Sequence, residues 1–177
     1  MTEAAPGRAR VAPDEFRAVM SRFSTGVAVV TCVQDGFDHA MTANSFTSVS
    51  LDPPLVLVCV ENDSRFHEAI SHAGSWAVSV LDAGQRGRAR WFATRGRPLV
   101  GQFDSTPTTR SHVTGSLLID GALAVLECRT VAVHPAGDHD IVVGEVLGMA
   151  LPGTDGEPLV YFRSGFRTLA EGPPTTG

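Results

Sequence analysis

The sequence contains no lysine, so all 14 basic residues of the 177-residue chain are arginines. This absence excludes a P-loop lysine, a Schiff-base lysine and a lysine general base. Any bound anion must therefore be held by arginine, hydroxyl groups, backbone N–H groups or a helix N-terminus. The net charge of −5 argues against a nucleic-acid partner, because nucleic-acid binding needs a basic face.

Cysteine is scarce, and long apolar runs are missing. Cys32, Cys59 and Cys128 stand far apart in apolar stretches without any Cys-x-x-Cys pair, so we expect no structural zinc site. Widely spaced cysteines of this kind are typical of buried, reduced thiols in a cytoplasmic protein. No run of about 18 apolar residues occurs, and residues 1–12 lack the apolar stretch of a secretory signal, so we expect no membrane partner.

The composition is that of an ordinary globular chain, with 43% hydrophobic and 19% charged residues. This length favours one compact domain with a sizeable core. Residues 1–12 and 171–177 are rich in Ala, Pro, Gly and Thr, so we expect a disordered N-terminal tail and a flexible C-terminal tail. The expected domain therefore spans residues 13–170.

A helix is predicted to begin at Pro13, because four apolar side chains then follow at helical spacing. These side chains are Phe16, Val19, Met20 and Phe23. Gly26 is expected to end this helix. Two further helices are predicted over residues 64–73 and 82–92.

Most of the remaining chain alternates with the period of β-strands. Asp-Gly pairs at residues 35–36 and 120–121 indicate hairpin turns, because both residue types tolerate positive φ. The sequence therefore predicts a mainly β fold, an antiparallel barrel with short helices, and argues against a doubly wound parallel sheet. The predicted strands are residues 27–33, 37–44, 55–60, 76–81, 116–119, 122–134, 141–151 and 159–163.

Residues 41–50 combine five hydroxyl groups and one amide between two strongly apolar strands. Small polar side chains let a ligand approach the backbone, and hydroxyl and N–H groups can hold a phosphate or a polar heterocycle. A solvated edge strand with outward polar positions is an equally good interpretation of this segment. The residues alone leave these two interpretations open.

Three other segments carry candidate chemistry, each with a simpler explanation beside it. Ser64 and Arg65 at a helix start can bind phosphate, although plain N-capping is the commoner use of such residues. His139 lies in a turn between two long strands, where a lone histidine is usually just solvated. The aromatic and arginine residues of 161–167 can stack on a flat ring or simply close the barrel.

Together these segments resemble the flavin reductase-like family, from about residue 16 to residue 169. The resemblance depends on four motifs in order. They are Phe16-Arg17-Ala18-Val19-Met20 with residues 23–31, Thr42-Ala43-Asn44-Ser45-Phe46-Thr47-Ser48-Val49-Ser50 with residues 51–56, Gly137-Asp138-His139, and Pro158-Leu159-Val160-Tyr161-Phe162-Arg163. The family implies a flavin-binding (FMN-binding) split barrel, antiparallel and Greek-key-like.

The resemblance also implies roles for individual residues, with cofactor binding but no catalytic acid, base or nucleophile. Ser164 stands where relatives usually have glycine, and Trp91 where many have arginine. The residues implied to contact the cofactors are Thr42, Ala43, Asn44 and Ser45 at the flavin ring and ribityl chain, Ser48, Val49 and Ser50 toward the phosphate, Ser64, Arg65 and Phe66 at the phosphate, His139 near the nicotinamide, and Arg163 and Phe166 in the closing segment.

The implied activity is that of an NAD(P)H:flavin oxidoreductase that takes a hydride from NADH or NADPH and delivers reduced FMN or FAD to a flavin-dependent monooxygenase. The resemblance further implies a homodimer, since relatives place the flavin near the subunit interface. Two alternatives remain at this point. One is an electron-transfer flavoprotein that keeps its FMN, and the other is a barrel that binds some other small ligand without catalysis.

Overall fold

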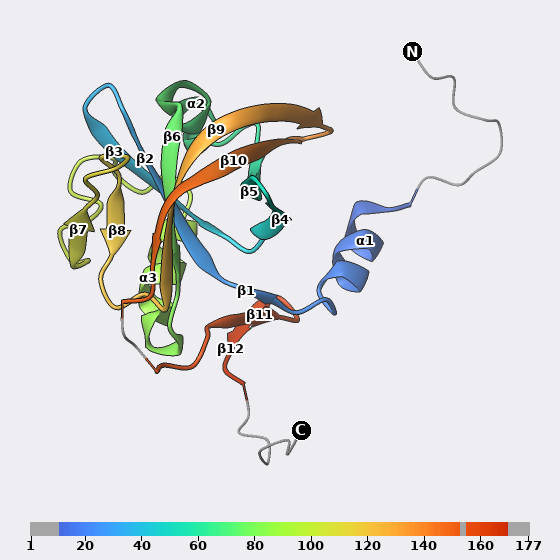
Figure 1. Ribbon diagram of the computed structural model, residues 1–177. Coiled ribbons are helices and arrows are strands. Elements are labelled where there is room, and N and C mark those ends of the chain that lie inside the picture. The colour runs from blue at the N-terminus through green and yellow to red at the C-terminus, as the bar shows by residue number, and fades with distance from the viewer. Residues whose placement is uncertain (1–10, 153–154, 170–177) are drawn as a thin grey trace.

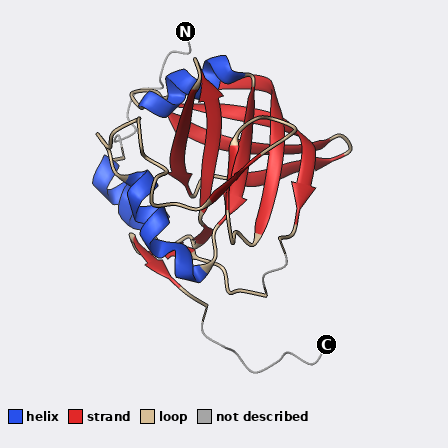
Figure 2. Ribbon diagram, turned by 90° about the vertical axis from the view of Figure 1, so that its left-hand side faces the viewer, coloured by secondary structure: helices blue, strands red, loops and turns tan. Residues whose placement is uncertain are grey.

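The computed structural model describes residues 11–152 and 155–169. The predicted tails, except for residues 11 and 12, lie outside the described residues. At the centre is a seven-stranded antiparallel sheet in the order β3-β2-β6-β9-β10-β5-β4, strongly curved in Figure 2. Its strands are β2 (Ala28–Gln34), β3 (Phe37–Ala43), β4 (Thr47–Leu51), β5 (Pro54–Glu61), β6 (Ser75–Val80), β9 (Ala124–Ala136) and β10 (His139–Ala150).

Hairpins join β2 to β3, β4 to β5 and β9 to β10, whereas β6 pairs with both β2 and β9, and β5 pairs with β10. This crossed order confirms the predicted mainly β, antiparallel barrel with short helices. The first turn is as expected, since Asp35 and Gly36 have φ values of 51° and 78°. Strand β4 matches the edge-strand interpretation of the polar segment, since its residues 47–51 are mostly exposed.

Alternate residues of the curved sheet face two separate hydrophobic clusters. On one face, α2 (Arg65–Ala73) covers a core that includes Phe66, Ile70 and Trp76. On the other face, α3 (Arg86–Ala93) packs Ala89 and Phe92 against the second core. The predicted helix over residues 82–92 is therefore split, because Asp82 caps a short 3₁₀ helix, η1 (Ala83–Gln85), that precedes α3.

The N-terminal helix α1 (Pro13–Met20) forms where predicted but ends six residues before Gly26. The prediction that Gly26 ends the helix was wrong, because β1 (Thr25–Gly26) is extended and pairs with β11 (Val160–Phe162). Figure 1 shows α1 projecting from the barrel, and none of its residues is buried. Its apolar stripe therefore covers nothing within the described part of this chain.

A small sheet in the order β1-β11-β12 closes the chain, and its last strand β12 (Gly165–Arg167) was not predicted. Arg163 and Ser164 form the tight turn with φ values of 49° and 55°. Both residues thus occupy the left-handed region that favours glycine or asparagine. The replacement of the family's usual glycine by Ser164 leaves the hairpin intact.

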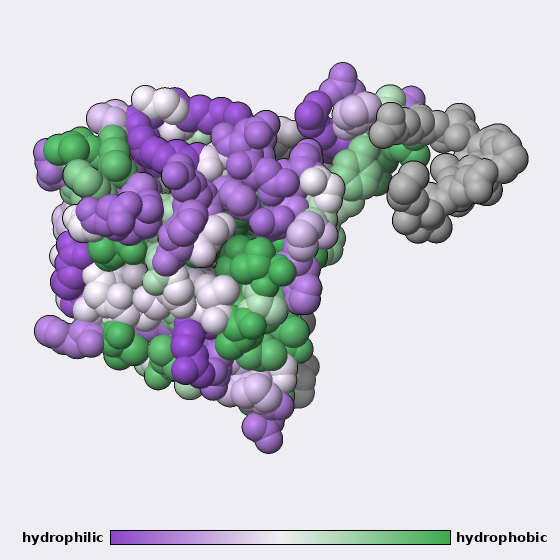
Figure 3. Space-filling model, turned by 90° about the horizontal axis from the view of Figure 1, so that it is seen from above, coloured by the Kyte–Doolittle hydropathy of each residue, from purple (hydrophilic) through white to green (hydrophobic). Residues whose placement is uncertain are grey.

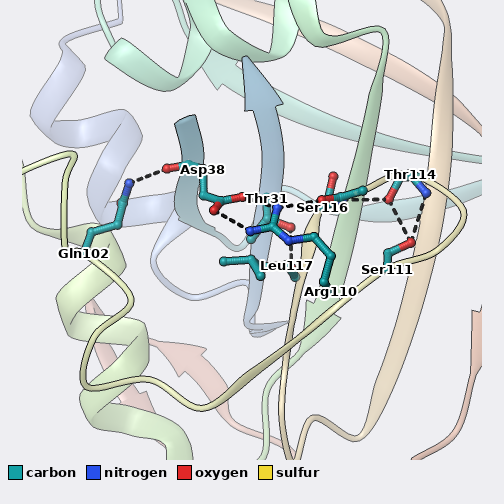
Figure 4. Close-up of polar contacts among 9 residues, drawn as sticks. Thr31, Asp38, Gln102, Arg110, Ser111, Thr114, Ser116 and Leu117 are labelled. Carbon is teal, nitrogen blue, oxygen red and sulfur yellow. Dashed lines mark hydrogen bonds and ion pairs between the residues drawn. The ribbon is translucent and has the colours of Figure 1, made fainter. Parts of the chain in front are cut away.

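The irregular segment of residues 95–116 is fastened to the β2–β3 hairpin by polar contacts, drawn in Figure 4. The guanidinium of Arg110 in β7 (Thr108–Arg110) donates to both carboxylate oxygens of Asp38 at 2.7 Å. Thr31 donates to the carbonyl of Leu117 in β8 (Leu117–Ile119) at 2.6 Å, and buried Gln102 donates to the carbonyl of Asp38 at 2.7 Å. Among the helices of residues 11–152 and 155–169, none has the length and apolarity to cross a bilayer.

Candidate functional site

A cavity of about 510 Å³ lies where β3, the start of α2, the segment after α3 and the β9–β10 turn meet. The structure brings eight of the predicted site residues to its wall. These residues are Thr42, Ala43, Asn44, Ser45, Ser64, Arg65, Phe66 and His139. The other predicted residues lie elsewhere: Ser48, Val49 and Ser50 on edge strand β4, and Arg163 and Phe166 in the β11–β12 hairpin.

The polar segment of residues 41–50 thus divides into two parts. Residues 42–45, at and just after the end of β3, line the cavity, whereas residues 47–51 form β4 at the opposite edge of the sheet. Both interpretations drawn from the sequence therefore apply, each to one half of the segment. Phe166 lines a second cavity of about 280 Å³ with Arg86 and Arg167.

Strand β3 is an edge of the sheet, so the backbone groups on its outer side have no ladder partner. The outward carbonyls of Asp38 and Ala40 accept hydrogen bonds from Gln102 and Arg97. Thr42 lies two residues after Ala40, and the pairing of β3 with β2 has no register shift. Thr42 therefore directs its backbone N–H and C=O to the same outer side as Ala40. One half of this edge is therefore covered by the loop, and the other half opens on the cavity.

Three hydroxyl groups on the wall already serve the fold. Thr42 Oγ1 donates to the carbonyl of Ala89 in α3 at 2.7 Å. Ser45 Oγ donates to the carbonyl of Cys59 at 3.0 Å and accepts from its N–H at 3.2 Å. Ser64 Oγ accepts from the N–H of His67 at 3.1 Å, which confirms the N-capping interpretation. The backbone edge, the Asn44 amide and the arginines remain as polar groups for a ligand.

Arg65 and Arg97 bring positive charge to the cavity wall. Arg65 donates to the carbonyl of Arg97 at 3.0 Å, and Arg97 donates to the carbonyls of Phe92 at 2.9 Å and Thr94 at 3.1 Å. Burial, and then the neighbouring Arg65, lower the pKa of Arg97 to about 10, so it remains charged at neutral pH. Within residues 11–152 and 155–169, neither guanidinium forms an ion pair.

His139 reaches the cavity wall from the tip of the β9–β10 hairpin. Its Nδ1 lies 2.7 Å from a carboxylate oxygen of Asp138, and this hydrogen bond lowers the pKa of the exposed Asp138 carboxyl. The N–H of Asn62 donates to the carbonyl of Asp138 at 3.0 Å. His67 on α2 pairs with Asp140 at 2.8 Å, so helix and hairpin are fixed to each other beside His139.

Several wall residues carry little or no signal in the sequence. His39 lies on β3 and Cys59 on β5, Phe92 and Ala93 end α3, and residues 94–97 follow that helix without regular structure. Burial raises the pKa of the Cys59 thiol, so this wall stays neutral there. For His39 alone a signal was available, because it lies three residues before Thr42 on the same predicted strand.

The family model for the flavin reductase like domain matches residues 20–170. The chain belongs to the flavin reductase-like family. An NADH-dependent FAD reductase of Streptomyces globisporus is 48% identical over 134 residues, which cover 75% of this chain and 73% of that protein. An NADH-dependent flavin reductase of a Rhodococcus species is 39% identical over 164 residues, 90% of this chain and 88% of that one.

Solved structures of flavin reductases share the fold. BorF, the flavin reductase component of a bacterial two-component tryptophan halogenase, superposes with a TM-score of 0.85 at 46% identity, over 90% of this chain and 99% of BorF. The Streptomyces globisporus NADH:FAD oxidoreductase SgcE6, solved with NAD and FAD fragments, gives a TM-score of 0.84 at 40% identity, over 96% of this chain and all of that one. This family member is therefore a split barrel.

Proposed function

We propose that this flavin reductase-like protein oxidises NADH, reduces FMN or FAD, and releases the reduced flavin to a flavin-dependent monooxygenase. The observation that carries the proposal is the cavity along the open half of the β3 edge, whose wall includes Arg65, Arg97 and His139. The relatives support NADH as the donor, since those above are named NADH-dependent. Another relative is the reductase component of a Thermus thermophilus 4-hydroxyphenylacetate 3-monooxygenase.

The residues of the cavity fit a flavin. The small side chain of Ala43 and the outward backbone groups of Thr42 suit a flat heterocycle with donors and acceptors along one edge. Arg65, close to the capped start of α2, suits a phosphate group. The predicted roles of Thr42, Ala43, Asn44, Ser45, Ser64, Arg65 and Phe66 as flavin contacts form part of this proposal. The roles of Ser48, Val49, Ser50, Arg163 and Phe166 stay predictions from the resemblance, because these residues lie outside the cavity.

The chain contributes position and electrostatics to the reaction. A bound flavin supplies the acceptor for a hydride from the nicotinamide ring. Thr42 in β3 is fixed to α3, and Ser45 just after β3 is fixed to β5, so this segment would hold one ring in place. The hairpin that carries His139 would bound the space for the other ring. The outward N–H of Thr42 would offer a hydrogen-bond donor to negative charge on a bound ring. No general acid, base or nucleophile is needed.

A single purified preparation tests this function. With added FMN or FAD, we expect NADH oxidation that requires flavin in excess of the protein, and reduction of cytochrome c by the flavin released. A protein that oxidises NADH only through permanently bound flavin would support the electron-transfer alternative. If the protein neither binds flavin nor oxidises NADH, the proposal is wrong, and the non-catalytic barrel is favoured.

His139 provides the prediction for the nicotinamide. Replacing His139 by Ala should raise the KM for NADH about 10-fold, roughly 1.4 kcal/mol, while the KM for flavin changes less than about twofold. His139 is expected to contact only the nicotinamide, which explains this split. His112→Ala is the control, because His112 is exposed and away from the cavity. An unchanged KM for NADH would remove His139 from the site.

We also propose that the protein is a homodimer and that α1 contributes to the interface. Phe16, Val19 and Phe23 are 59%, 69% and 68% exposed along one face of the helix and the turn after it. Figure 3 shows further apolar surface on the barrel beside this projecting arm. Monomers seldom expose so much connected apolar surface, so a second copy is the expected cover. A cytoplasmic location is part of the proposal, since all three cysteines are free thiols.

The dimer is tested by placing charge on the helix. The double variant Phe16→Asp/Val19→Asp should have the mass of one subunit in light scattering at micromolar concentration, because two carboxylates cannot be buried without partners. Ala18→Asp adds a charge on the opposite face of the same helix and should leave the dimer unchanged. Equal masses for all three proteins would exclude α1 from the interface, and a monomeric parent protein would exclude the dimer.

A further inference from the structure

His39 on β3 is a buried polar residue of the cavity wall without a hydrogen-bond partner. Its side chain is 6% exposed, and its Nδ1 atom is sealed from solvent without a partner among the described residues. A buried polar nitrogen left unpaired costs about 1–3 kcal/mol, so its retention calls for an explanation. Every other polar side chain on the same stretch of β3 has a protein partner: Asp38 binds Arg110, and Thr42 binds Ala89.

The charges around His39 leave positive charge in excess. Arg65 and Glu68 face it from α2, Arg97 from the segment after α3, and Asp38 from its own strand. Asp38 is already neutralised by Arg110 through two hydrogen bonds, whereas Arg65 and Arg97 donate only to uncharged oxygens. On β2, Cys32 lies opposite His39 in the register, and burial raises its pKa to about 12, so it stays a neutral thiol.

In this surrounding the imidazole is neutral at pH 7. Burial is the main cause of its lowered pKa, and the guanidinium of Arg65 is the next. The neutral imidazole therefore carries one N–H. Protonation of His39 beside Arg65 and Arg97 becomes favourable only when an anion binds near them. A phosphate held by Arg65 and Arg97 would supply that negative charge within the same cavity.

We propose that His39 takes up a proton from solvent when the 5′-phosphate of a flavin binds beside Arg65 and Arg97, so that flavin affinity depends on pH. This inference rests on the proposed function, because it assigns a coupled proton to the same site. Free His39 is neutral and phosphate-bound His39 is protonated, so affinity rises as the pH falls through the bound-state pKa. The gain stops below the pKa of the free protein, where His39 is protonated in both states.

The test compares FMN with riboflavin, which lacks the phosphate. Dissociation constants are measured by flavin fluorescence between about pH 6.5 and 8.5, above the second ionisation of a phosphate ester near pH 6. We expect the parent protein to bind FMN about threefold more tightly at the lower pH, since an opposite charge shifts a pKa by about one unit and burial already lowers the pKa of free His39. Riboflavin affinity should change less than about twofold over the same range.

Two variants and one calorimetric measurement decide the outcome. His39→Asn should abolish the pH dependence for FMN, and His112→Asn should retain it. Titration calorimetry of the parent protein in buffers of different ionisation enthalpy should show net proton uptake with FMN and none with riboflavin. A pH dependence that survives in His39→Asn, or that riboflavin shares, overturns the inference.

These results are separable from the proposed function. If the parent protein reduces flavin but binds FMN without proton uptake, only the role of His39 is wrong. If the parent protein neither binds nor reduces flavin, the proposed function and this inference both fail. Should His39→Asn fold poorly by circular dichroism, the calorimetry of the parent protein decides alone.

Discussion

Replacing Arg97 by Met is expected to lower the free energy of unfolding by about 2–4 kcal/mol and to raise the KM for flavin about 10-fold or more. The guanidinium donates to the carbonyls of Phe92, Thr94 and Ala40 and to the side chain of Gln102. Methionine preserves the apolar stem but leaves these oxygens without a donor. The part of the cavity wall that follows α3 then loses its attachment to the β3 edge.

Arg90→Met is the matched control. Arg90 belongs to α3, is exposed and makes no hydrogen bond or ion pair through its side chain with another described residue. Denaturant unfolding and steady-state kinetics with varied flavin should show little change in this variant. If Arg97→Met matches Arg90→Met in both measurements, the attachment of the loop contributes neither to stability nor to the cavity.

The second large effect is expected for Gly144→Ala in β10. A Cβ at this position would lie 2.4 Å from Trp76 Cζ2 and 3.0 Å from Cys128 Cβ. Both neighbours are fully buried, so neither can move aside without disturbing the core. Overpacking of this kind costs about 3 kcal/mol, which corresponds to a Tm lower by about 6–12 °C in a chain of this size.

Gly87→Ala in α3 is the control, because a Cβ there meets nothing within 4 Å. Alanine favours a helix over glycine by about 1 kcal/mol, so this variant should be as stable as the parent protein or slightly more so. Thermal unfolding followed by circular dichroism measures both variants. A Tm for Gly144→Ala within about 2 °C of the parent value would show that β10 shifts enough to accommodate the added methyl group.

Much of the fold could be predicted because it depends on local preferences. The Asp35-Gly36 turn, the cap of α2 by Ser64 and its end at Gly74 all follow from backbone chemistry within a few residues. Strand β4 and the end of α1 could not be predicted in this way. Each is decided by a distant partner strand, β5 for β4 and β11 for the segment after α1.

The candidate site was predictable in part for the same reason. Residues 42–45 stand out in the sequence because small polar side chains interrupt apolar strands, and Ser64 and Arg65 stand out because a hydroxyl and a guanidinium lie together at a helix start. Arg97 and His39 do not stand out, since their roles depend on contacts with residues far along the chain. Arg97 reaches Ala40 across 57 positions. No local pattern indicates which arginine of an irregular segment will do so.

By itself the sequence determined the antiparallel β architecture and the polar segment that borders the cavity, because alternation and turn chemistry act over neighbouring residues. The family followed from the resemblance of four motifs. Only the tertiary structure decided which half of that segment opens on the cavity, which hydroxyl groups are already used, and that the apolar face of α1 has no cover within the described chain. The periodicity of apolar residues specifies which side of a helix or strand is apolar. Which other element covers that apolar side depends on how distant parts of the chain pack together.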